Sequence, residues 1–279
     1  MELLTIGLEL SPSLDFRLRV FRDYLKEKGF QVVPSDPRQL ADYRQWLEQK
    51  GYALTTIANI ISSVRDLYRK AGIETKGWIK SIRQPKGFLR DRVPVADTKK
   101  LIDYVNQNCT LRDKLIVWTM ASLGRREVEL SRMDVGDFYQ DGDYHYARFR
   151  PKYHDAKDVT KLVTNGLLQV FLEYQNQLKS KNPDDPMFPS RKHGRLRPKN
   201  ISFIVAELMK KAGVKTEMNT RRITPHSLRH TAASVAMSES GGNVFAVKEF
   251  LDHEKVETTM KYIHYAIPPE QRPENLVKW

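Results

Sequence analysis

Residues 224–231 read Thr-Pro-His-Ser-Leu-Arg-His-Thr and hold the densest group of chemically versatile side chains in the 279-residue chain. This order predicts the start of a helix, with Thr224 as the N-cap and Pro225 at the first helical position. His226 and Arg229, three residues apart, then lie on neighbouring points of the first turns. A helix N-terminus that carries two cationic groups favours a phosphate ligand. A capped helix with surface charges is the simpler alternative.

A second motif, residues 122–130, reads Ser-Leu-Gly-Arg-Arg-Glu-Val-Glu-Leu and joins an apolar helix to a following one. A glycine turn directly before an arginine presents the guanidinium from a rigid base, where it can bind an anion. Structural ion pairs between the two arginines and the two glutamates would give the same pattern.

A third motif places Tyr262 nine residues after His253, which ends the sequence Leu-Asp-His. We expect a helix from Val256 to Tyr265, on which Tyr262 points about 120° away from the apolar face, given 3.6 residues per turn. This geometry predicts that Tyr262 is not a core aromatic, which leaves its phenol able to face the groove bordered by His226 and Arg229. An inert, half-exposed tyrosine is the simpler alternative.

The charge balance points to a polyanionic partner. The chain has 47 Lys and Arg against 34 Asp and Glu, a net charge of +13, with an excess of basic residues in both halves. A single cysteine excludes an intramolecular disulfide framework and favours a reducing compartment, so we expect a cytoplasmic protein. The longest apolar run is far shorter than the roughly 20 residues that span a bilayer, so no membrane association is expected.

Several kinds of chemistry lack their sequence signatures. The seven histidines form neither an HExxH motif nor a Cys/His cluster, and the acidic residues are scattered. Neither a phosphate-binding GxxxxGK[ST] loop nor a GxGxxG fingerprint occurs. We therefore expect no metal and no other cofactor.

Hydrophobic periodicity predicts a mainly helical protein with one small antiparallel sheet. Apolar residues at helical spacing, with glycine stops, predict three helices before residue 73 and a fourth short piece at 78–82. A segment rich in proline and without helical period follows. We divide the chain into residues 1–86, a linker at 87–94, and residues 95–279. Strands are expected at 143–150 and 161–164, and further helices at 97–106, 111–123, 167–178, 200–211 and from 226 almost to the end.

Taken together, the three motifs resemble those of the tyrosine recombinases, also called the phage integrase family. The resemblance covers about residues 95–265. The family's first box, Gly-x-Arg-x-x-Glu-Leu with a later acidic residue, is matched by Gly124, Arg126, Glu129, Leu130 and Asp137. Its second box, Pro-His-x-Leu-Arg-His-Thr, is matched by residues 225–231. Its third box is matched by Leu251, His253, Tyr262 and the pair Thr258-Thr259.

The resemblance implies a two-domain clamp on duplex DNA, in which residues 1–86 form the helical core-binding (SAM-like) domain and residues 95–279 the catalytic domain. It implies a site-specific recombinase or integrase that cuts DNA through a 3′-phosphotyrosyl intermediate, without ATP or metal, as a homotetramer on two DNA sites. The catalytic residues implied are Arg126, Lys157, His226, Arg229, His253 and Tyr262. A DNA-relaxing enzyme of the type IB topoisomerase kind, or a catalytically silent DNA-binding protein of the same fold, is the alternative.

Two features depart from the family pattern. Asp252 replaces the usual glycine before His253, which either alters that turn or adds a negative charge near the site. The family's lysine lies in a β-hairpin, where this chain offers three candidates. Lys157 has the better register because Lys161 and an apolar strand follow it, while Lys152 remains open. His226 is the residue expected to assist proton transfer from Tyr262.

Overall fold

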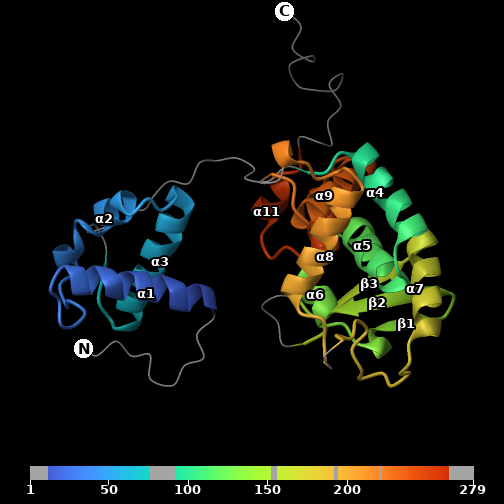
Figure 1. Ribbon diagram of the computed structural model, residues 1–279, viewed down its shortest axis with the longest axis horizontal. Helices are drawn as coiled ribbons and strands as arrows, with labels where there is room; N and C mark the ends of the chain where they lie inside the picture. The colour runs from blue at the N-terminus through green and yellow to red at the C-terminus, as the bar shows by residue number, and fades with distance from the viewer. Residues whose placement is uncertain (1–11, 76–91, 152–155, 192–193, 220–221, 264–279) are drawn as a thin grey trace, which may run out of the picture. The chain divides into compact units, whose positions relative to one another are not determined.

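A computed structural model describes residues 12–75, 92–151, 156–191, 194–219 and 222–263. Contacts divide the chain into two compact units, residues 1–87 and 88–279 (Figure 1). Helices dominate both units, and the larger one contains a three-stranded antiparallel sheet. The predicted fold class is therefore confirmed. The short helical piece expected at 78–82 lies outside the described residues.

The smaller unit is a cluster of helices around an aromatic core. Its elements are α1 (Pro12–Glu27), the 3-10 helix η1 (Pro37–Leu40), α2 (Tyr43–Gln49) and α3 (Leu54–Lys70). The rings of Phe21, Tyr24, Tyr43 and Trp46 pack against one another, and all four are buried. The glycines that follow α1, α2 and α3 all have positive φ, as expected for helix stops.

The second predicted helix is interrupted in the structure. Asp36 caps its start by accepting the backbone N–H of Arg38 at 3.0 Å, but the first turn is a 3-10 helix that ends at Leu40. The α-helix begins only after Asp42, whose carboxylate is bound by Tyr24 and Lys28 on the neighbouring chain segment. These tertiary contacts hold Asp42 at the break.

The larger unit is built around α5 (Leu111–Leu123). This helix is buried on several faces and packs against α4 (Val95–Asn108), α7 (Asn165–Gln177), α8 (Pro198–Lys211) and α9 (His226–Glu239). A helix that is apolar on all sides belongs in a core. The remaining helical elements are α6 (Glu127–Ser131), η2 (Val135–Asp137), η3 (Glu217–Asn219), α10 (Val244–Leu251) and α11 (Val256–Met260).

The sheet lies at one end of the larger unit in Figure 1 and has the strand order β1-β2-β3. Strand β1 (Phe138–Asp141) was not predicted, whereas β2 (Tyr144–Phe149) and β3 (Val159–Val163) lie within two residues of the expected strands. Asp141 pairs with Tyr144 across a tight turn at Gly142, which has a φ of 56°. The sheet buries Phe138, Ala147, Phe149 and Val163 against the helical core.

Two local predictions near the C-terminal motifs are wrong. The N-cap of α9 is Pro225 and not Thr224; the backbone N–H of Thr224 instead donates to the hydroxyl of Ser227 at 3.0 Å. The helix expected to reach residue 265 ends at Met260, and Tyr262 lies in the turn that follows. Among the described residues, no helix combines the length and apolar character needed to cross a membrane.

Candidate active site

Arg229 ties together the ends of two helices. It lies in the first turn of α9, is 1% exposed, and donates Nη1 to the carbonyl of Gly124 at 2.6 Å and Nη2 to the carbonyl of Leu251. Gly124 follows α5 and Leu251 ends α10. Carbonyls at a helix C-terminus lack partners within the helix and attract cations. Arg229, from the first motif, thus contacts both Gly124 of the second motif and Leu251 of the third.

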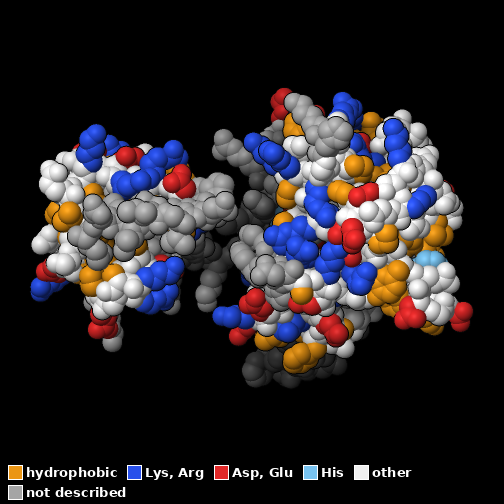
Figure 2. All heavy atoms as spheres, turned by 90° about the horizontal axis from the view of Figure 1, so that it is seen from below, with side chains coloured by type: hydrophobic (Ala, Val, Ile, Leu, Met, Phe, Trp, Pro, Cys, Tyr) orange, Lys and Arg blue, Asp and Glu red, His pale blue; other side chains and the backbone are white. Residues whose placement is uncertain are grey.

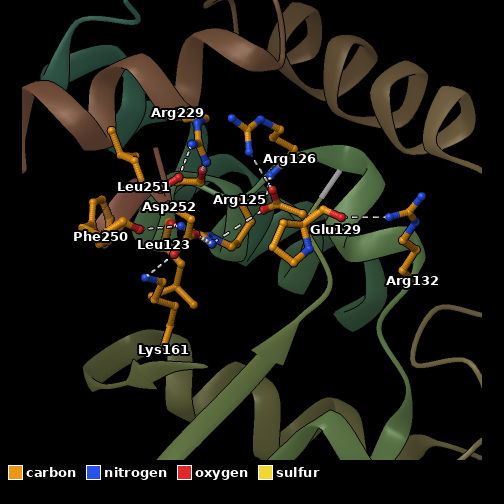
Figure 3. A network of polar contacts seen from close by, with 12 residues as sticks. Leu123, Arg125, Arg126, Glu129, Arg132, Lys161, Arg229, Phe250, Leu251 and Asp252 are labelled. Carbon is orange, nitrogen blue, oxygen red and sulfur yellow. Dashed lines mark hydrogen bonds and ion pairs between the residues drawn. The ribbon is translucent and has the colours of Figure 1, made fainter. Parts of the chain in front are cut away.

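Arg126 begins α6 and is held by Glu129. The backbone N–H of Arg126 donates to one carboxylate oxygen of Glu129 at 3.0 Å, and Nη1 donates to the other at 2.9 Å. The Arg126 side chain is 27% exposed, whereas that of the adjacent Arg125 is fully buried. Of the two arginines, Arg126 is the one that a ligand can reach, in agreement with the register that selected it (Figure 3).

His253 is a neutral hydrogen-bonding group in this site. Its Nδ1 lies 2.8 Å from the hydroxyl of Thr259, and both residues are buried. Burial lowers the pKa of His253 to about 3, and the positive charges of Arg229 and Arg126 add to the effect. His253 is therefore uncharged at neutral pH.

Tyr262 is buried, contrary to the expectation that it lies outside the core. It is 4% exposed and belongs to an apolar cluster that also contains Ala233, Met237, Val247 and Leu251. The expectation failed because it extended helical periodicity past Met260, where α11 ends. The hydroxyl is nevertheless turned toward the first motif: it lies 2.6 Å from Nδ1 of His230.

His230 is the residue that the sequence analysis missed. It belongs to the first motif but was given no role, while His226 was expected to assist the tyrosine. In the structure the two histidine rings are in edge-to-face contact, with centroids 5.0 Å apart. The signal was present in the sequence, because His230 stands four residues after His226 and so shares its helix face.

The candidate lysines are held by carboxylates or lie outside the described residues. Nζ of Lys157 is 2.5 Å from Asp134 and 2.7 Å from Asp137, both buried. Nζ of Lys161 is 2.8 Å from Asp252 and 2.6 Å from the carbonyl of Glu249. Lys152 lies outside the described residues. Both described lysines therefore belong to ion pairs in this structure.

The arrangement favours an anion. Burial lowers the pKa of Arg229 to about 9, helped by the nearby charges of Arg126 and Arg125, so its cationic form still predominates at neutral pH. An incoming negative charge would relieve this repulsion. In the part of the chain that is described, no group of three or more His, Cys, Asp or Glu residues could hold a metal ion. Lys and Arg also gather near the middle of the larger unit's face in Figure 2.

Comparison with known proteins identifies the class. The Phage integrase family matches residues 92–267, and the Phage integrase N-terminal SAM-like domain matches residues 14–74. The chain therefore belongs to the phage integrase family, the tyrosine recombinases, which cleave and rejoin DNA. Neither the topoisomerase-like nor the catalytically silent alternative is favoured.

Among curated relatives, a tyrosine recombinase of Pseudothermotoga lettingae is 27% identical over 223 residues, covering 75% of this chain and 70% of that protein. Tyrosine recombinase XerA of Pyrococcus horikoshii is 24% identical over 263 residues, covering 91% and 85%. Coverage differs among relatives: the chain spans 57% of tyrosine recombinase XerC of Caldanaerobacter subterraneus.

Two solved structures show the same fold. The XerH site-specific recombinase bound to its difH substrate in a pre-cleavage complex has a TM-score of 0.69 at 18% identity, covering 95% of this chain and 77% of that one. The Tn1549 transposon integrase in complex with circular intermediate DNA has a TM-score of 0.68 at 15% identity, covering 91% and 90%.

Proposed function

We propose that this tyrosine recombinase cuts DNA with Tyr262. The phenolic oxygen attacks a backbone phosphorus, forming an O–P bond, while the bond from phosphorus to the 5′ oxygen breaks. The product is a 3′-phosphotyrosyl link and a free 5′-hydroxyl. A 5′-hydroxyl of a partner strand then attacks that link and releases the tyrosine. Because each step exchanges one phosphoester for another, strand exchange consumes no ATP.

Arg126, Arg229 and His253 would stabilise the negative charge on the non-bridging oxygens of the reacting phosphate. Prepositioned donors of this kind lower the barrier of phosphoryl transfer. Arg229 is held by two backbone carbonyls and Arg126 by Glu129, so little reorganisation is needed when DNA binds. The neutral His253 would donate a hydrogen bond, and an approaching phosphate would favour its protonation.

His230 supports the nucleophile directly. With Nδ1 unprotonated, it accepts the hydrogen bond from the Tyr262 hydroxyl and can take the proton as the O–P bond forms. His226 packs against His230 and would assist the same proton transfer from the position that the sequence predicted. This contact is needed because a free phenol, with an ordinary pKa of about 10, supplies little phenolate at neutral pH.

A lysine would protonate the departing 5′ oxygen. We assign this role to Lys157, which lies just before β3, with Lys152 as the alternative. For Lys157 to act, its ammonium has to exchange at least one of its carboxylate partners, Asp134 and Asp137, for the leaving group.

The 2.6 Å contact between Tyr262 and His230, which directly follows Arg229 on α9, is the observation that carries this proposal. The test uses a nicked duplex selected from a randomised DNA pool by its covalent adduct with the wild-type protein. The wild type forms an adduct that survives SDS, and Tyr262→Phe forms none. An adduct that persists in Tyr262→Phe would remove Tyr262 from the role.

The rest of the family reaction also belongs to the proposal. Residues 1–86 would contribute the second half of a DNA clamp, and four copies would assemble on two DNA sites, in the cytoplasm. Light scattering of the protein mixed with the selected duplex tests the assembly: a complex of four chains and two duplexes is expected. A complex that stays at one chain per duplex would contradict it.

A further inference from the structure

Two arginines from different elements satisfy the carbonyls at the ends of the same two helices. Arg229 takes those of Gly124 and Leu251. Arg125 takes the carbonyls one residue earlier in each segment, donating Nε to Leu123 at 2.8 Å and Nη2 to Phe250 at 2.5 Å. Consecutive carbonyls after α5 and at the end of α10 are thus bound by a pair of guanidinium groups (Figure 3).

Asp252 supplies the negative charge that this arrangement needs. Its carboxylate contacts Nη1 of Arg125 and lies 2.8 Å from Nζ of Lys161. The Arg125 side chain is fully buried, and a buried cation without a partner is costly. Glu129 is a more distant partner, 3.7 Å from Arg125. Figure 3 shows Asp252 between Arg125 and Lys161.

The backbone of Asp252 adopts a left-handed conformation, which costs conformational free energy for a residue other than glycine. Asp252 has a φ of 53° and is the only non-glycine residue in the described part of the chain with a positive φ. A left-handed conformation costs an L-residue roughly 1–2 kcal/mol, although Asp tolerates it better than most. The turn therefore keeps the shape that the family's glycine would give, and the carboxylate is the added element.

We propose that Arg125 and Asp252 are positioning residues, whose ion pair fixes the separation of the α5 and α10 ends and thereby the place of Arg229. This positioning role rests on the proposed function of Arg229. Arg229 has one anchor on each helix end, so a shift between the ends moves or releases its guanidinium. His253 follows Asp252 directly and is carried by the same turn.

The test separates positioning of Arg229 from general stability. Replacing one non-bridging oxygen of the scissile phosphate by a methyl group removes the negative charge that Arg229 stabilises. On this methylphosphonate duplex, tested as both stereoisomers, the loss of Arg229 should matter little. A variant that slows cleavage by displacing Arg229 should likewise cleave the methylphosphonate duplex at nearly the wild-type rate. A variant that is merely destabilised should be slow on both duplexes.

The variants are Asp252→Asn, which keeps the shape and tolerates the left-handed turn, and Arg125→Met. Single-turnover adduct formation on the phosphodiester duplex should fall about tenfold or more in each, since small displacements in an active site have large effects on rate. On the stereoisomer that rescues Arg229→Ala, their rates should lie within about threefold of wild type. DNA affinity should be unchanged.

Two further variants keep the result interpretable. The double variant Arg125→Met with Asp252→Gly removes both charges and the strain of the left-handed turn, so it should fold even if a single variant does not. Its cleavage should be slow on the phosphodiester duplex and close to wild type on the methylphosphonate duplex. Asp113→Asn breaks a partly buried pair with Arg112 at the opposite end of α5 and should leave both rates unchanged.

One outcome would overturn the positioning role alone: Asp252→Asn slows cleavage equally on both duplexes, while Arg229→Ala regains its rate on the methylphosphonate duplex. If Arg229→Ala is itself not relieved, the proposed role of Arg229 fails, and the positioning role fails with it. Normal rates of Asp252→Asn and the double variant on the phosphodiester would also overturn the inference.

Discussion

The hydroxyl of Tyr262 lies 2.6 Å from Nδ1 of His230, a histidine one helical turn after the one that the sequence had favoured. His230→Ala should therefore lower the rate of adduct formation by about a hundredfold, within the usual range for a lost proton acceptor. DNA affinity should not change. Single-turnover cleavage of the nicked duplex measures the rate, and Ser234→Ala, one turn further along α9, is the control. A normal rate in His230→Ala would show that the contact plays no part in cleavage.

The ring of Tyr262 and its hydroxyl should contribute very differently to stability. Tyr262→Phe removes one hydrogen bond and should lower the free energy of unfolding by about 1 kcal/mol. Tyr262→Ala also empties part of an apolar cluster and should cost about 3–5 kcal/mol. Urea unfolding of the full chain, followed by near-ultraviolet circular dichroism, gives both values. If Tyr262→Phe and Tyr262→Ala lower the free energy of unfolding by the same small amount, the ring is not packed in solution.

His253 should make the protein less stable in mild acid. In the unfolded chain a histidine binds a proton near pH 6.5, but His253 in the folded protein resists protonation until about pH 3. Between these values the unfolded state binds more protons, so the free energy of unfolding falls as the pH falls. From pH 7 to pH 5, wild type should lose about 2 kcal/mol more than His253→Gln. An identical pH dependence in the two proteins would contradict a lowered pKa of His253.

Gly124 should be sensitive to alanine for two reasons. Its φ of 61° is strained for any L-residue, at roughly 1–2 kcal/mol, and a Cβ would lie 3.2 Å from Cδ2 of Leu251. Because the Gly124 carbonyl binds Arg229, Gly124→Ala should lower both stability and the cleavage rate. Gly142→Ala has a similar φ with open space around it, so it should cost stability alone. Equal cleavage rates in the two variants would contradict the crowding argument.

The lysine assignment can be decided with a modified leaving group. Lys157→Ala should block cleavage of the ordinary duplex but not of one whose 5′ leaving group is a thiol, since a thiolate departs without a proton. Lys152→Ala and Lys161→Ala are measured beside it. If Lys152→Ala shows the selective rescue, Lys152 takes the role and the ion pairs of Lys157 with Asp134 and Asp137 are structural.

Periodicity and punctuation in the sequence predicted most of the helices and two of the three strands, and the three motifs carried the resemblance to the family. Local signals sufficed because α3 and α8 carry apolar residues at helical spacing and α5 is strongly apolar. A glycine with positive φ follows each of the three helices and marks its end. Strand β1 was missed because four residues are too few to show alternation. The split of the second helix depends on Asp42 contacting a different segment, which no local pattern reports.

The site was harder to predict because its decisive contacts join distant residues. Register selected Arg126 over Arg125, and no local pattern indicated that Arg125 is buried against the end of α10, more than a hundred residues later in the chain. The departure at Asp252 was visible, but its partners were not. The orientation of Tyr262 was mispredicted because the end of α11 at Met260 carries no glycine or proline signal.

The enclosure of Tyr262 also bears on when the protein can act. If Tyr262 is the nucleophile, a side chain that is 4% exposed cannot reach a phosphate of a duplex that only contacts the protein surface. Tyr262 would have to leave its apolar cluster before the phenol meets a phosphate, so DNA binding would precede cleavage. The proposed recombinase would then bind duplex DNA without cutting it until that movement occurs.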